Sequence, residues 1–157
     1  MTDAADSEAA ALAAGYVRYA QSLRHDDDPD AVCSPETDRD RRAYELVDQA
    51  IKHGPAARAW TYSLAVLARA PDAELGAFAA GPLEDCLRIH GAALVEQIER
   101  EAAAHERFRW ALGTIWLSEH DLPPDVLRRI VRASADAIKV LEWLPRDGSS
   151  GRSRDVP

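Results

Sequence analysis

The chain has few aromatic residues, few cysteines and no long apolar run. Of its 157 residues 6% are aromatic, and Cys33 and Cys86 are its two cysteines. They lie in unrelated contexts, which is not the even framework of a disulfide-rich secreted domain. No segment approaches the ~20 apolar residues that cross a membrane, and the first eight residues contain Asp3, Asp6 and Glu8 but no Lys or Arg. We therefore expect a cytoplasmic protein that does not bind a membrane.

Positive charge is also in short supply. Nineteen Lys and Arg residues stand against twenty-seven Asp and Glu residues, which gives a formal net charge of −8. Such a chain repels phosphate backbones, so we predict no nucleic-acid partner. The same charge favours association with a basic protein.

Signatures of catalysis and cofactor binding are absent from the sequence. It has no glycine-rich phosphate loop and no dinucleotide fingerprint. It also has no G-x-S-x-G elbow, no HExxH pair and no paired cysteines that would suggest zinc. We therefore predict no cofactor and no metal, and the sequence gives an enzyme little support.

Apolar residues recur at helical spacing along most of the chain, and no strand alternation occurs. We predict one all-α domain over residues 1–145. Its parts are a first helix at 7–24, an acidic linker at 25–37, a helical core at 38–118 and a C-terminal helical region at 123–145. Residues 146–157 cannot build a core, and we predict that they form a disordered tail.

Three stripes define the faces that we expect to be buried. The first helix presents Leu12, Tyr16, Tyr19, Ala20 and Leu23; the helix that follows Gly54-Pro55 presents Trp60, Leu64, Leu67 and Ala68; and the strongest stripe is Phe108, Ala111, Leu112, Ile115 and Trp116. This last set has i, i+3, i+4, i+7, i+8 spacing and is predicted to face the core. Between these stripes, Pro82 to Gly91 has every mark of a short capped helix, with proline first, acids in the first turn and glycine last.

Short helices joined by Gly and Pro turns predict one of two architectures. One is a stack of antiparallel helix pairs, in the manner of a short HEAT-like array, and the other is an irregular helical bundle. The sequence shows no repeat of fixed period. Both architectures therefore stay open.

One string of residues resembles a known signature. It is Ala79-Ala80-Gly81-Pro82-Leu83-Glu84-Asp85-Cys86-Leu87, followed by His90-Gly91, Ile98-Glu99 and Phe108-Arg109. This string resembles a bacterial family of unknown function with an AAGPLEDLL-x-x-HG signature, from which the chain departs at Cys86, where leucine is usual. The resemblance implies kinship without an activity to carry over.

Four residues are weak candidates for a polar or metal site: Glu84, His90, Glu101 and His105. Glu84 and His90 lie six residues apart, about 240° around a helix, and so share no face. Glu101 and His105 have the i,i+4 spacing that can place two ligands on one metal, but zinc needs three or four. Helix capping and polar helix ends explain all four residues more simply. Cys86 falls on an apolar stripe and is predicted to be an inert core thiol.

Possible partner-binding residues lie in two other places. Projection of the last predicted helix puts Arg132, Asp136, Lys139 and Trp143 on the side opposite its apolar stripe, where Trp143 would be an exposed interface anchor. Packing of Trp143 onto the fold is the alternative. The acidic run that includes Asp26, Asp27 and Asp28 suits a basic partner, or is simply a solvated linker.

These features favour a non-enzymatic protein-interaction module, of the immunity or antitoxin kind or an accessory subunit, whose partner is another protein. Two alternatives stay open. One is a metal-dependent or acid/base enzyme whose His/Glu site is assembled by the fold. The other is a self-associating structural protein, since the sequence does not specify the oligomeric state.

Overall fold

The protein, seen in a computed structural model, is described over residues 2–25 and 35–134. These residues form helices, turns and connections without a strand in either range, which confirms the predicted all-α class. The elements are α1 (Thr2–His25), α2 (Pro35–His53), α3 (Ala56–Arg69), the 3-10 turn η2 (Asp72–Glu74), α4 (Leu75–Phe78), the π-helical turn η3 (Ala79–Leu83), α5 (Glu84–Ala104), α6 (Glu106–Leu112) and α7 (Pro124–Ala133). No helix in the described ranges is long and apolar enough to cross a membrane.

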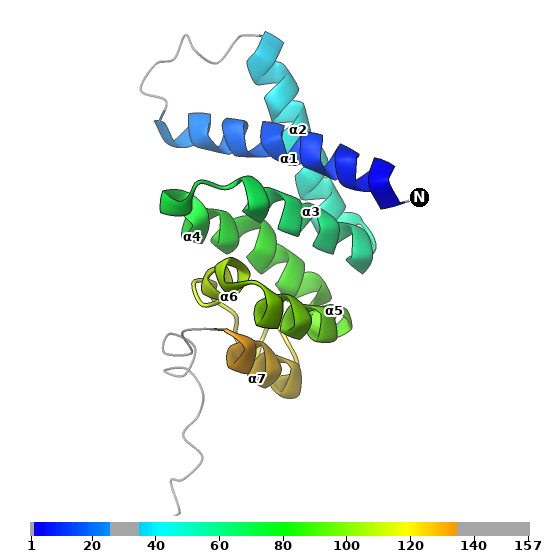
Figure 1. Ribbon diagram of the computed structural model, residues 1–157, viewed down its shortest axis with the longest axis vertical. Coiled ribbons are helices and arrows are strands. Elements are labelled where there is room, and N and C mark those ends of the chain that lie inside the picture. Colours follow the sequence, from blue (N-terminus) through cyan, green and yellow to red (C-terminus); the bar gives the residue numbers. More distant parts are fainter. Residues whose placement is uncertain (1, 26–34, 135–157) are drawn as a thin grey trace, which may run out of the picture.

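The helices stack along the long axis of the molecule (Figure 1). The N-terminal pair α1 and α2 lies at one end, and α7 lies at the other. Between them, α3 packs against α1, α2 and α5, and α5 packs in turn against α6 and α7. The helices range from 24 residues in α1 to 4 in α4, so the stack is irregular.

The first two helices approach each other closely at Gly15. A Cβ atom at this position would lie 2.7 Å from the Cβ of Ala43 on α2. Stacked rings of Tyr16 and Tyr44, with centroids 4.5 Å apart, extend the same interface. Arg18 then joins α2 through two hydrogen bonds to Asp40, of 2.8 and 2.7 Å. The absence of a side chain at Gly15 thus allows α1 and α2 to pack closely at this point.

The buried faces of α1 and α3 differ in part from the predicted stripes. The buried residues of α1 are Ala9, Ala13, Tyr16, Val17 and Ala20, and those of α3 are Ala59, Tyr62, Ser63, Val66 and Leu67. Leu23, predicted to be buried, is 61% exposed. Small alanines face the neighbouring helices instead, because α1 and α3 each pack closely against more than one helix.

Helical structure continues from Leu75 to Ala104 without a break. The predicted short helix from Pro82 to Gly91 is wrong, because Pro82 lies inside the π-helical turn η3 and Gly91 lies in the middle of α5. A Cβ atom at Gly91 would lie 3.0 Å from Leu122 Cδ2. Gly91 therefore allows the segment before α7 to pack closely against α5, and it does not end a helix.

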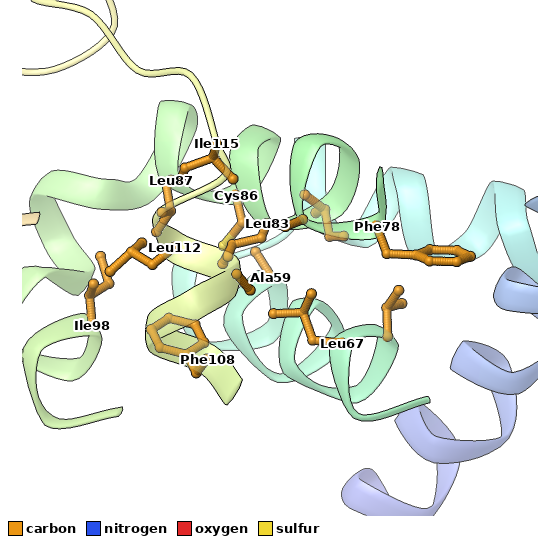
Figure 2. Close-up of a cluster of buried hydrophobic side chains, with 14 of the residues drawn as sticks. Ala59, Leu67, Phe78, Leu83, Cys86, Leu87, Ile98, Phe108, Leu112 and Ile115 are labelled. Atoms are coloured by element: carbon orange, nitrogen blue, oxygen red, sulfur yellow. The ribbon is translucent and has the colours of Figure 1, made fainter. Parts of the chain in front are cut away.

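The α6 region confirms most of the strongest stripe but corrects its last member. Phe108, Ala111, Leu112 and Ile115 are buried. Figure 2 shows Phe108, Leu112 and Ile115 in the core with Leu87 and Ile98 of α5. Trp116, which the stripe predicts to face the core, is 56% exposed. The reason is that α6 ends at Leu112, so the helical spacing no longer applies at Trp116.

Two helices begin earlier than predicted, and the first is α1, which begins at Thr2 instead of residue 7. α2 begins at Pro35, so the last residues of the predicted linker at 25–37 are helical, ahead of the expected start at Asp38. α7 ends at Ala133, and Ser134 after it has an extended ψ of 150°. The rest of the linker and the predicted continuation to 145, with the tail at 146–157, lie outside the described residues.

Candidate functional site

The Gly81-Pro82 string forms the π-helical turn that precedes α5. The Ser63 hydroxyl of α3 lies 3.1 Å from the Pro82 carbonyl oxygen and 2.9 Å from the Ala59 carbonyl oxygen. Ser63 is fully buried, so its hydroxyl provides a hydrogen-bond partner inside the core for the Pro82 carbonyl group of the π-helical turn. Cys86 packs beside it, and burial raises the pKa of the Cys86 thiol to about 11. This part of the motif has a structural explanation.

Glu84, the first residue of α5, connects two distant segments. Its Oε1 accepts a 2.7 Å hydrogen bond from Arg88, and its Oε2 accepts a 2.9 Å hydrogen bond from the backbone N–H of Trp116. Arg88 also donates to Asp121 at 2.9 Å and lies 3.5 Å from Asp85. Because the Glu84 side chain is only 13% exposed, these bonds hold the α6–α7 connection to the start of α5.

Asp121 fixes the other end of this connection. Its Oδ2 accepts hydrogen bonds from the Ser118 backbone N–H at 2.9 Å and from the Ser118 hydroxyl at 2.8 Å. Burial works against the charged form of Asp121, but the bonds from Ser118 and Arg88 outweigh it and hold the pKa of Asp121 below its ordinary value. Burial likewise opposes the charge on Arg88, while Glu84 and Asp121 raise the pKa of Arg88. Both Asp121 and Arg88 are therefore charged at neutral pH.

Trp116 stands outward from this network. Its backbone N–H donates a hydrogen bond to Glu84, while the residue as a whole is 56% exposed to solvent. On α5, Ile89 is 49% exposed and lies one turn beyond Asp85, which is 3.5 Å from Arg88. We name this region the Trp116 surface; it consists of Glu84, Asp85, Arg88, Ile89, Trp116 and Asp121.

Charge on and around the Trp116 surface is predominantly negative. Three carboxylates, those of Glu84, Asp85 and Asp121, stand against Arg88 and Lys52, the latter 3.7 Å from Asp85. An exposed indole beside surplus carboxylates can bind a cation, because the ring face attracts the cation and the carboxylates form ion pairs with it.

The four weak polar candidates are not brought together. Glu84 belongs to the Trp116 surface, whereas His90 Nε2 lies 3.0 Å from the carbonyl oxygen of Ile51 at the end of α2. Glu101 and His105 form a separate pair, with 2.7 Å between Oε1 and Nδ1. In the described ranges no group of three or more His, Cys, Asp or Glu residues is arranged to hold a metal ion.

The Glu101–His105 pair lines part of an apolar groove of about 300 Å³. Leu64, Leu67 and Ala68 of α3, Leu75 of α4 and Phe108 of α6 form its apolar lining. Arg107 closes one side; it forms an ion pair with Asp72 and donates to the Leu67 carbonyl oxygen at 3.1 Å. We name this hollow the α3–α6 groove.

The partner-binding candidates Asp26, Asp27, Asp28, Asp136, Lys139 and Trp143 lie outside the described residues. Within the described part, sequence reasoning missed Trp116 and Ile89 as exposed apolar residues. The signal that could have placed Trp116 was Gly113, which follows Leu112 directly and ends the helix. Nothing in the local sequence indicates the bond between Trp116 and Glu84, because 32 residues separate them.

The fold and this surface define a small all-α protein that carries an exposed aromatic residue within an ion network. The chain belongs to a family of unknown function, DUF6869, which matches residues 34–138. This match supports the expected kinship with a family of unknown function and covers α2 to α7 in the described part. Neither the curated proteins nor the solved structures contain a significant match.

Proposed function

We propose that the chain is a non-enzymatic protein-interaction module that binds a basic protein through the Trp116 surface. The observation that carries this proposal is the exposure of Trp116, whose backbone is anchored while its indole remains largely in solvent. Tryptophan is enriched at the centres of interfaces, where a rigid aromatic side chain loses little conformational entropy on binding.

The charge of the surface supports a basic partner. The surplus of carboxylates around Trp116 has the same sign as the net charge of the whole chain, −8. Both therefore steer a basic protein toward the chain and repel an acidic one. An Arg or Lys side chain on the partner would stack on the Trp116 indole and pair with Glu84 or Asp85.

A regulatory role fits a module of this size. We propose that it acts in the manner of an immunity protein, an antitoxin or an accessory subunit, in which one acidic face covers a basic partner. The bacterial origin implied by the AAGPLEDLL-x-x-HG signature and a cytoplasmic location belong to the same proposal.

The test uses two matched tryptophan variants of the full chain as bait in a native extract. Trp116→Ala should remove a stoichiometric partner, whereas Trp110→Ala should retain it, because Trp110 is 47% exposed on α6 and lies outside the Trp116 surface. The partner should be basic, and raising the salt from about 50 to 200 mM should weaken binding through screening.

Urea unfolding must give both variants nearly the stability of the parent chain, since each removed side chain is about half exposed. Retention of the partner by Trp116→Ala would refute the proposal. Loss with Trp110→Ala alone would move the interface to α6 and refute it equally.

A further inference from the structure

We propose that the α3–α6 groove binds residues 135–145 of the same chain. This proposal is independent of the Trp116 surface. It rests on the shape and lining of the groove, on the place where α7 ends, and on the sequence that follows Ser134.

The groove needs an apolar occupant. A cavity of about 150 Å³ lined by Leu, Ile and Phe accepts benzene, so a groove of about 300 Å³ has room for two branched side chains. Its polar wall groups already bind one another: Glu101 pairs with His105, and Arg107 pairs with Asp72 and with α3 carbonyl groups. Little polar capacity is left for a hydrophilic ligand.

The end of α7 points to the occupant. Arg132 and Ala133, in the last turn of α7, line a second hollow together with Ala102 and Ala103 of α5 and Arg109 of α6. This hollow and the α3–α6 groove share the corner where α5 passes into α6, since the neighbouring residues Glu101 and Phe108 line the groove. The chain therefore leaves α7 beside the corner that leads to the groove.

The length of residues 135–145 is sufficient. Eleven residues span about 16 Å as a helix and about 36 Å when extended. A helix with its side chains is about 10 Å wide. The extended segment is thus more than three times as long as one helix is wide, which is enough to pass around the α5–α6 corner.

The composition of the segment matches both hollows. Its large apolar residues are Ile138, Val140, Leu141, Trp143 and Leu144. Its first acid, Asp136, follows Ser134 by two residues and can meet Arg109 and Arg132 in the second hollow. Arg132 has no ion-pair partner within the described ranges, whereas Arg129 there is bonded to Glu99 at 2.8 and 2.6 Å. Charge thus favours entry of the segment along this route.

Disulfide trapping in the full chain tests the proposal. In a Cys33→Ser background, Ala68→Cys in the groove is combined with Glu142→Cys, which spares every apolar residue of the segment. The matched control combines Ala93→Cys, an exposed alanine on the outer face of α5, with the same Glu142→Cys. Cys86 is buried and should not compete.

We expect the groove pair to form a disulfide at least tenfold faster than the control pair, within one chain. Adding Ile138→Asp and Leu141→Asp should reduce the groove rate to the control rate. A mixture of isotopically labelled and unlabelled protein distinguishes bonds within one chain from bonds between copies.

Three outcomes would overturn the proposal. They are equal rates for the two pairs, a fast groove pair that is unaffected by the aspartates, and disulfides formed only between copies. The last outcome would assign the groove to a second molecule of the chain.

Discussion

Replacement of Glu84 tests whether the Trp116 surface is preorganised. Glu84→Ala removes the acceptor of two charge-assisted hydrogen bonds, one from Arg88 and one from the Trp116 N–H. Hydrogen bonds to charged groups each contribute about 1.5 to 3 kcal/mol. The Arg88 bond is worth less, because Arg88 is 40% exposed and keeps Asp85 and Asp121. We expect the free energy of unfolding to fall by about 2 kcal/mol.

Two readouts measure this effect. Urea unfolding gives the loss of stability, and hydrogen exchange of the Trp116 amide reports the freed connection. Glu84→Gln keeps an acceptor for the Trp116 N–H, so it should preserve the amide protection while losing about 1 kcal/mol. Glu96→Ala, on the exposed face of α5, is the control and should change stability by less than about 0.5 kcal/mol. An unchanged Trp116 exchange rate in Glu84→Ala would refute the idea that Glu84 holds the connection.

Three further predictions follow from the packing. Gly15→Ala should destabilise the protein by about 1 to 3 kcal/mol, because its Cβ atom would clash with Ala43. Gly76→Ala, whose Cβ atom would lie 3.8 Å from Thr114, should be neutral or slightly stabilising. Thermal unfolding compares the two variants, and equal effects would contradict the α1–α2 contact. Leu87→Ala in the core should cost about 2 to 5 kcal/mol by urea unfolding, and a loss below about 1 kcal/mol would be inconsistent with its full burial. Burial raises the pKa of Cys86 from 9.0 to about 11, so the unfolded thiol ionises first and stability should fall between pH 9 and 11; Cys86→Ala should lack this component, and an identical pH dependence in both proteins would argue against it.

The sequence predicted the helical class because apolar spacing is a local property. Phe108, Ala111 and Leu112 repeat at helical intervals and are buried as expected. Cys86 lies in the core, as its position beside Leu87 indicated. In these cases the local pattern and the tertiary environment require the same residue type.

The prediction of helix ends failed where tertiary packing uses the same residues differently. The local sequence predicts that Gly91 is a C-terminal cap, but its missing side chain allows Leu122 to pack closely against the middle of α5. Trp116 continues the helical spacing of Phe108 and Leu112 in the sequence, but the helix ends at Leu112. A glycine that caps and a glycine that admits a neighbour have the same local sequence.

The candidate site could be predicted only in part for a similar reason. Glu84 stood out as an acid in a first turn, which the macrodipole alone explains. Its contacts with Arg88 and Trp116 come from one nearby and one remote segment, and only the fold joins them. Exposure of Trp116 and Ile89 depends on this same assembly.

Site-specific photo-crosslinking in living cells tests the central claim most directly. A photoreactive amino acid is placed at Ile89 on the Trp116 surface and, as the control, at the exposed Ala77 of α4. We predict that the Ile89 position captures one basic protein, that Trp116→Ala abolishes this product, and that the Ala77 position does not yield it. The same product from both positions, or a product that persists in Trp116→Ala, would contradict the assignment of the Trp116 surface as the binding face.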